Sequence, residues 1–164
     1  MIANNMAPGL NRPFAAEEWE FAGGKSLFDR ARQEARESRI DGRPDILGSD
    51  IDARSIDLCK KHAKKAGVMV NWKVAPLKEL STDKSGGLIV CNPPYGERMM
   101  EKREAEALYR EMRKKFDELD NWQVSVITAY RDFERIYGKR ADKRRKLSNG
   151  GMVCTMYQYF KRND

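Results

Sequence analysis

The pattern of apolar and polar residues along the chain predicts helices that alternate with strands. Some segments carry an apolar residue at every third or fourth position, which is the spacing of a helix with one buried face. Others are short apolar or alternating runs, which favour strands. Helices are expected over residues 26–38, 53–66, 101–119 and 132–136, and strands over residues 45–49, 68–74, 87–91, 122–129 and 152–160. This alternation indicates an α/β sheet with helices packed on it.

Residues at the ends of these segments support their bounds. Ser26 and Asp52 are suitable N-caps, because their side-chain oxygens can accept a hydrogen bond from the first helical turn. Gly67 stands where a helix often ends in a left-handed glycine. Two aromatic residues that precede the first helix, Trp19 and Phe21, are expected in the core.

The chain is organised around the strand over residues 87–91 and the loop Asn92-Pro93-Pro94-Tyr95 that follows it. The strand is short, apolar and bounded by turn formers, which predicts a buried strand. Proline has no N–H to donate and fixes its own φ angle, so the strand must end in a stiff loop. Asn92 and Tyr95 then lie at the carboxyl edge of the sheet, where open α/β folds bind ligands.

Such a loop suits methyl transfer to a planar amino group. An amino group on a base ring is a poor nucleophile, because its lone pair is delocalised into the ring. The Asn92 side-chain oxygen and the Pro93 carbonyl can accept its two hydrogens, and the rigid Pro93-Pro94 pair holds these acceptors in place. Tyr95 can stack on the base. An ordinary proline turn after a strand is the alternative interpretation.

The loop resembles the (Asp/Asn)-Pro-Pro-(Tyr/Phe) motif of S-adenosylmethionine-dependent amino-methyltransferases. The resemblance extends to the catalytic domain of the 23S rRNA guanine-N2 methyltransferase family, some of whose members are labelled N6-adenine-specific DNA methylases. That family couples a THUMP RNA-binding domain to a Rossmann-like methyltransferase domain. The segments that carry the resemblance are, in order, residues 7–12, 17–19, 48–52 and 92–98.

The resemblance implies a class I, Rossmann-like sheet with helices on both faces, formed by residues 1–164 as a single catalytic domain. It implies S-adenosylmethionine as the cofactor, with Asp50 on the ribose, Ile51 on the adenine and Asn92 also in the cofactor site. The implied substrate is guanine N2 of large-subunit rRNA. No metal is implied, since a sulfonium needs no Lewis acid to lose its methyl group.

The glycine-rich motif and first strand of the family are missing from this sequence, as is the THUMP domain. We therefore expect a domain that is incomplete at its N-terminus. The missing strand would lie between the strands that end at Asp50 and Asn92, and its absence would leave two unpaired edges. We expect this fragment to be inactive alone. We also expect it to close the gap in the sheet, to swap elements with a second copy of itself, or to associate with a separately supplied N-terminal segment that carries the THUMP domain.

Composition narrows the class of protein. The chain has 40% hydrophobic and 35% charged residues, which is typical of a globular protein, and a net charge of +7, which favours a polyanion such as RNA as partner. No apolar run is long enough to span a membrane. Three separated cysteines and a single histidine predict reduced thiols in a cytoplasmic protein and no zinc site.

The densest basic run, over residues 139–146, comes before a turn signal and the last predicted strand. This order predicts a β-hairpin whose cations contact RNA phosphates. A solvated surface is the alternative. The candidate nucleic-acid-binding residues are Lys143, Arg144, Arg145, Lys146 and, after the loop, Arg98.

Three other functions stay open on the sequence alone. Adenine N6 of DNA presents the same kind of amino group to an Asn-Pro-Pro-Tyr loop, and only an assay of nucleic-acid specificity separates it from guanine N2. Protein glutamine is methylated by a related loop, although the basic run argues against it. A non-catalytic RNA-binding fragment of the enzyme is the third, and RNA binding without cofactor binding would support it.

Overall fold

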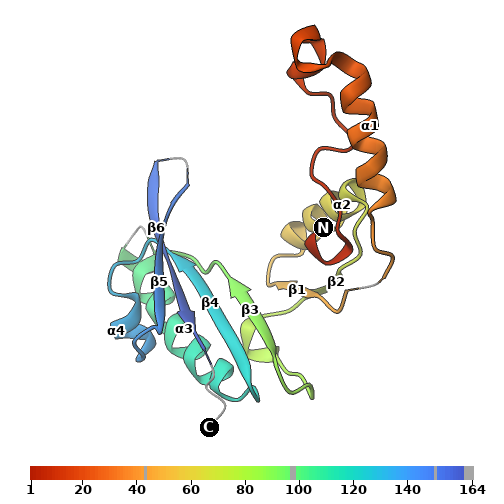
Figure 1. Ribbon diagram of the computed structural model, residues 1–164. Coiled ribbons are helices and arrows are strands. Elements are labelled where there is room, and N and C mark those ends of the chain that lie inside the picture. The colour runs from red at the N-terminus through yellow and green to blue at the C-terminus, as the bar shows by residue number, and fades with distance from the viewer. Residues whose placement is uncertain (43, 97–98, 150, 161–164) are drawn as a thin grey trace. The chain divides into compact units, whose positions relative to one another are not determined.

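The computed structural model describes residues 1–42, 44–96, 99–149 and 151–160 of the chain (Figure 1). These residues form two compact units, Met1–Ala75 and Pro76–Asp164. Each unit contains both helices and strands, which confirms the predicted α/β class. That the whole chain folds as one catalytic domain stays a prediction.

The first unit is a βαβ element with a helix and three short 3-10 turns before it. The strands β1 and β2 run parallel, with Leu47 opposite Asn71, and α2 connects them. The turns η2 and η3 pack against α1, whereas Asn4 of η1 is bonded to Ile40 and Gly42, beyond the end of that helix. Its elements are η1 (Ile2–Asn4), η2 (Ala15–Glu18), η3 (Glu20–Ala22), α1 (Gly24–Glu37), β1 (Leu47–Asp50), α2 (Ala53–Ala66) and β2 (Asn71–Val74).

Local signals fix the bounds of α2. The Asp52 carboxylate accepts the Arg54 backbone N–H at 2.9 Å, which satisfies one of the free amides of the first turn. Gly67 ends the helix in the left-handed region with φ of 66°. Ile56 is buried, and Cys59 and Ala63 lie on the same face. The predicted bounds, both caps and the inward face are confirmed.

The start of α1 differs from the prediction. The helix begins at Gly24 after Gly23, so Ser26 lies inside the first turn and is not its N-cap. Trp19 and Phe21 are 51% and 88% exposed, and their rings stack on each other at 5.6 Å. The prediction that they belong to the core is wrong, because successive 3-10 turns place both rings on the outside.

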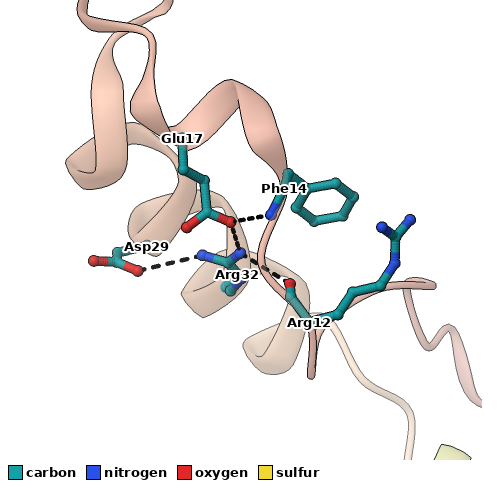
Figure 2. Close-up of polar contacts among 5 residues, drawn as sticks. All are labelled: Arg12, Phe14, Glu17, Asp29 and Arg32. Carbon is teal, nitrogen blue, oxygen red and sulfur yellow. Dashed lines mark hydrogen bonds and ion pairs between the residues drawn. The ribbon is translucent and has the colours of Figure 1, made fainter.

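An ion-pair network, and not the packing of Trp19 and Phe21, holds the N-terminal loop on α1 (Figure 2). The Arg32 guanidinium pairs with Glu17 and Asp29 and donates to the Arg12 carbonyl at 3.2 Å. The Glu17 carboxylate also accepts the Phe14 backbone N–H at 2.7 Å. The hydrogen bond from Arg32, followed by the one from Phe14, lowers the pKa of Glu17, so this carboxylate stays ionised.

The second unit is a mixed four-stranded sheet in the order β3-β4-β6-β5. The α3 helix connects the parallel strands β3 and β4, whereas β6 runs antiparallel to both β4 and β5. Its elements are η4 (Leu77–Glu79), β3 (Gly87–Cys91), α3 (Met99–Asp117), β4 (Trp122–Thr128), α4 (Phe133–Tyr137), β5 (Lys143–Asn149) and β6 (Met152–Tyr159). The predicted hairpin formed by the last two strands is confirmed.

The core of this unit lies between α3, α4 and the central strands. The apolar face of α3 is buried at Ala105, Met112 and Phe116 and partly buried at Leu108. Tyr109 is fully buried and its ring contacts those of Tyr130 and Phe133. Val124 and Val126 of β4 pack against these helices from the sheet. This core anchors α3, which follows the Asn92 loop, and β4, the strand that pairs with β3.

The strand β3 is less buried than predicted. Among the described residues it pairs with β4 alone, and Leu88 and Val90 are more than half exposed. Only the alternate residues Ile89 and Cys91 pack on the core. A Cβ at Gly87 would lie 2.6 Å from the ring of Trp122, its cross-strand partner, so the tryptophan covers the start of the strand.

Candidate active site

The loop that follows β3 presents its polar groups on a rigid frame. Pro93 is buried, Asn92 and Pro94 are exposed, and Tyr95 is half-buried. Gly96 ends the loop with φ of +67°. A Cβ at this position would lie 2.6 Å from the Lys102 Cα, so the loop approaches the backbone of α3 as closely as only glycine allows.

Tyr95 and Asn92 are joined within the loop. The Tyr95 hydroxyl donates to the Asn92 side-chain oxygen at 2.7 Å and lies 3.7 Å from the Cys154 sulfur. Burial, and then the contact with Cys154, raises the pKa of Tyr95, so its hydroxyl remains a donor at neutral pH. Because an amide oxygen has two lone pairs, Asn92 keeps the capacity to accept a second hydrogen bond.

Tyr109 ties the loop to the core. Its hydroxyl donates to the Pro94 carbonyl at 2.6 Å and lies 3.5 Å from the Thr128 hydroxyl at the end of β4. Burial raises the pKa of Tyr109, which keeps the hydroxyl protonated. Sequence reasoning missed this residue, although a tyrosine on the apolar stripe of a helix signals a hydroxyl that needs a buried partner.

The Pro93 carbonyl is the second candidate acceptor. Among the described residues no hydrogen bond to it is formed, whereas the neighbouring Pro94 carbonyl is occupied by Tyr109. The loop therefore offers one amide oxygen with a spare lone pair and one backbone carbonyl that has no partner in the described part of the chain. Two acceptors on adjacent residues match the two hydrogens of one amino group.

A hollow of about 360 Å³ lies between the loop and α3. Pro94, Tyr95 and Gly96 form one wall, and Glu101, Glu104 and Leu108 are among the α3 residues that form the other. Its carboxylates repel phosphate and favour N–H donors. The hollow suits the edge of a base better than a nucleic-acid backbone.

The predicted cofactor residues lie at the end of β1 in the first unit. One Asp50 carboxylate oxygen accepts the Asp52 backbone N–H at 2.8 Å, which orients the carboxylate and leaves its other oxygen available. Ile51 is 73% exposed. A carboxylate beside an exposed apolar side chain fits the diol and the base of a nucleoside.

The predicted RNA-binding cations lie on β5, at one edge of the sheet. Lys143, Arg145 and Lys146 are exposed, while the Arg144 guanidinium pairs with the Glu134 carboxylate at 2.7 Å. Basic side chains also protect an edge strand from pairing with another chain. Arg98, the remaining candidate, lies outside the described residues.

The cysteines are free thiols, and burial raises the pKa of Cys91 to about 12. Within the described residues, no group of three or more histidine, cysteine, aspartate or glutamate side chains is arranged to hold a metal ion. None of the described helices combines the length and the apolar character needed to cross a bilayer.

Residues 1–158 match the RMKL-like methyltransferase domain. The chain belongs to this family. The predicted family resemblance is thereby confirmed.

Two relatives and one solved structure show what the domain is similar to. The chain is 41% identical over 165 residues to "Putative RNA methyltransferase YpsC" of Bacillus subtilis, covering 99% of this chain and 43% of that protein. It is 31% identical over 160 residues to ribosomal RNA large subunit methyltransferase K/L of Legionella pneumophila, covering 96% of this chain and 23% of that protein. The crystal structure of SMU.472 complexed with SAH superposes with a TM-score of 0.92 at 38% identity, covering 100% of this chain and 44% of that one.

The superposition on the SMU.472 structure shows the fold of this chain. The superposition spans the whole chain, so the predicted Rossmann-like methyltransferase fold is confirmed. This chain spans less than half the length of each of the three proteins.

Proposed function

We propose that the chain, acting together with the N-terminal segment or second copy expected above, transfers the methyl group of S-adenosylmethionine to the exocyclic amino group of a base in RNA, namely guanine N2 of large-subunit (23S) rRNA. The observation that carries this proposal is the pair of acceptors on Asn92 and Pro93, held on a loop that Tyr109 fixes to the core. Membership of the RMKL-like methyltransferase domain family and its ribosomal RNA methyltransferase relatives supports RNA as the substrate.

The two acceptors act on the nucleophile. When Asn92 and the Pro93 carbonyl accept the two amino hydrogens, the nitrogen lone pair is drawn out of conjugation and directed away from the loop. The nitrogen then bonds to the methyl carbon, the carbon–sulfur bond breaks with its electron pair left on sulfur, and the nitrogen releases one proton to solvent. The proline backbone keeps both acceptors in place, so little reorganisation is needed in the transition state.

Tyr95 has two roles in this proposal. Its hydroxyl orients the Asn92 amide by donating to the oxygen, so that the oxygen and not the nitrogen faces the substrate. Its half-buried ring forms a wall of the hollow beside the loop, where a base removed from its stack can lie against it.

Cofactor binding is assigned to the end of β1. The available Asp50 oxygen accepts a ribose hydroxyl, and the exposed Ile51 covers one face of the adenine. Asn92 is the cofactor residue proposed on the second unit. S-adenosylmethionine, when bound, supplies a methyl group activated by a positively charged sulfur.

RNA contacts are assigned to the hairpin. Lys143, Arg145 and Lys146 extend from β5, and within the described residues none of them forms an ion pair like that of Arg144 with Glu134. They are suited to the phosphates that flank the target base. With ribosomal RNA as the substrate, the location that we propose for the chain is the cytoplasm.

Nucleoside analysis of the source cells tests the proposal. Large-subunit rRNA from cells in which the gene is deleted should lack one N2-methylguanosine that wild-type rRNA contains, and the wild-type gene should restore it. Digestion to nucleosides followed by mass spectrometry measures this directly. Unchanged rRNA would overturn the proposal, and a loss of N6-methyladenine from DNA or of methylglutamine from protein would identify the alternative substrate.

A further inference from the structure

A basic pocket lies in the first unit, where the C-terminal ends of α1 and α2 meet the N-terminal loop. Its volume is about 430 Å³, which is large enough for a nucleotide-sized ligand. Four cations line it: Arg36 in the last turn of α1, Arg39 just beyond that helix, and Lys64 and Lys65 in the last turn of α2. The methyl-transfer proposal uses none of them.

The lining of the basic pocket does not balance this positive charge. No carboxylate is among the described residues that line it. Arg36, Lys64 and Lys65 form no ion pair within the described part of the chain, and Arg39 Nε lies 3.9 Å from a fully exposed Asp41 carboxylate. An exposed pair of this length contributes little. The pocket therefore holds a local excess of positive charge.

The positions of the cations are only partly explained by the helices. A cation in the last turn of a helix is favoured by the helix dipole by about 0.3–1 kcal/mol. That effect acts on each helix separately and does not require the two ends to meet. Bringing both sets of cations to one hollow adds mutual repulsion, which a bound anion would remove.

The rest of the lining is apolar or neutral. Met6 and Leu10 are half-buried, Ala35 and Ala66 come from the two helices, and Asn11 supplies an amide. Such a surface suits a sugar or the face of a base, while the cations suit phosphates. This combination differs from the hollow beside the Asn92 loop, whose carboxylates oppose phosphate.

Hydrogen bonds hold the segments around the basic pocket in place before any ligand binds. On one side the buried Asn4 amide donates to the Ile40 carbonyl at 3.0 Å and to the Gly42 carbonyl at 2.8 Å, which holds the N-terminal turn against the segment after α1. On the other side Arg32 donates to the Arg12 carbonyl, which fixes the end of the loop that supplies Leu10 and Asn11 (Figure 2). A fixed rim lowers the ordering cost of binding.

We propose that the basic pocket binds the sugar–phosphate backbone of single-stranded RNA, as a contact separate from the methyl-transfer loop. Arg36 and Arg39 on one wall and Lys64 and Lys65 on the other pair with successive phosphates, and the apolar floor accepts the sugar between them. RNA as the occupant rests on the proposed function; the anion-binding character of the pocket does not.

Fluorescence anisotropy with a labelled single-stranded RNA of about 12 nucleotides tests this inference without any methyl donor. Lys64→Ala/Lys65→Ala is compared with Lys60→Ala/Lys61→Ala, a pair on the same helix that is also exposed but does not line the pocket. We expect the pocket pair to weaken RNA binding at least 10-fold and the control pair less than 2-fold. The salt dependence of the affinity should also become shallower, by about 1 in log–log slope.

The second wall provides an independent comparison. Arg36→Ala should weaken binding, whereas Arg30→Ala, an exposed position on α1 away from the pocket, should not. Thermal melts show whether each variant is folded, and the exposed alanines are compatible with a helix. A polyglutamate of equal charge should fail to displace the RNA.

Equal losses in the pocket and control variants would overturn the inference, since binding would then follow net charge alone. Full RNA affinity in the pocket variants, or displacement by polyglutamate, would also overturn it. The two proposals can fail separately. If the anisotropy measurement shows RNA binding that depends on the pocket, but gene deletion leaves the rRNA unchanged, the methyl-transfer proposal is refuted and this inference stands.

Discussion

At the scale of single residues, the candidate active site depends on which hydrogen-bond acceptors of the loop are occupied. Tyr109 occupies the Pro94 carbonyl and Tyr95 occupies one lone pair of Asn92. Within the described residues this leaves one Asn92 lone pair and the Pro93 carbonyl as the acceptors that we propose for the substrate. Both tyrosine hydroxyls have a raised pKa and stay protonated as donors. The loop is therefore shaped by buried phenols and not by proline alone.

Tyr109→Phe tests this role. Losing the bond to the Pro94 carbonyl should lower the free energy of unfolding by about 1 kcal/mol and reduce methyl transfer at least 10-fold with little change in cofactor affinity. The matched control is Tyr159→Phe, another buried tyrosine that donates to a backbone carbonyl, that of Lys139 at 3.3 Å. The control should lose similar stability and keep its activity. Equal activity in the two variants would show that the hydrogen bond from Tyr109 does not hold the loop for methyl transfer.

The Arg32–Glu17 pair makes a pH-dependent contribution to stability. Because the folded-state pKa of Glu17 is lowered, its contribution is present above the unfolded pKa and is lost as pH falls through the folded value. Glu17→Gln should therefore destabilise the protein near neutrality and show a weaker loss of stability between about pH 5 and about pH 3. Denaturant unfolding at several pH values measures this. Glu18→Gln, which removes the same charge at an exposed neighbour, should follow the wild-type profile.

At the scale of elements, the close approach of the loop to α3 depends on Gly96. An added Cβ would lie 2.6 Å from Lys102 Cα and 2.9 Å from the Glu101 carbonyl oxygen, in a left-handed conformation. Gly96→Ala should therefore combine backbone strain of about 1–2 kcal/mol with a displacement of the loop that lowers methyl transfer.

Gly138→Ala separates these two effects. Gly138 has φ of +81°, but a Cβ there meets nothing within 4 Å, so it carries the strain without the clash. Denaturant unfolding should show a larger loss for Gly96→Ala than for Gly138→Ala. Equal losses would mean that the approach to α3 is not tight.

The elements that could be predicted are those that local signals determine. The α2 helix (Ala53–Ala66) begins after Asp52 and ends before Gly67, because both caps act on neighbouring residues. Trp19 and Phe21 were placed wrongly, because burial of an aromatic side chain depends on what folds over it. The sequence does not predict that Tyr109 bonds to Pro94, or that Arg36 and Lys64 line one pocket. Both features depend on the approach of segments that are distant in the chain.

At the scale of the whole molecule, the positive charge is distributed over both units. The net charge of +7 includes the cations of the basic pocket in the first unit and those of β5 in the second. The hollow beside the Asn92 loop carries carboxylates instead. Each unit therefore carries a basic surface that suits the backbone of RNA, and the second unit also carries an acidic hollow that suits a single base.

The most direct test of the central claim is the amount of N2-methylguanosine in large-subunit rRNA of deletion cells that carry Asn92→Ala in this chain. We expect methylation of the target guanosine to fall by about 100-fold or more relative to the wild-type gene, because one of the two amino-hydrogen acceptors is removed. Asn71→Ala, an exposed asparagine on β2 in the first unit, should restore the modification and serves as the control. Full modification with Asn92→Ala, at a normal level of the protein, would contradict the account.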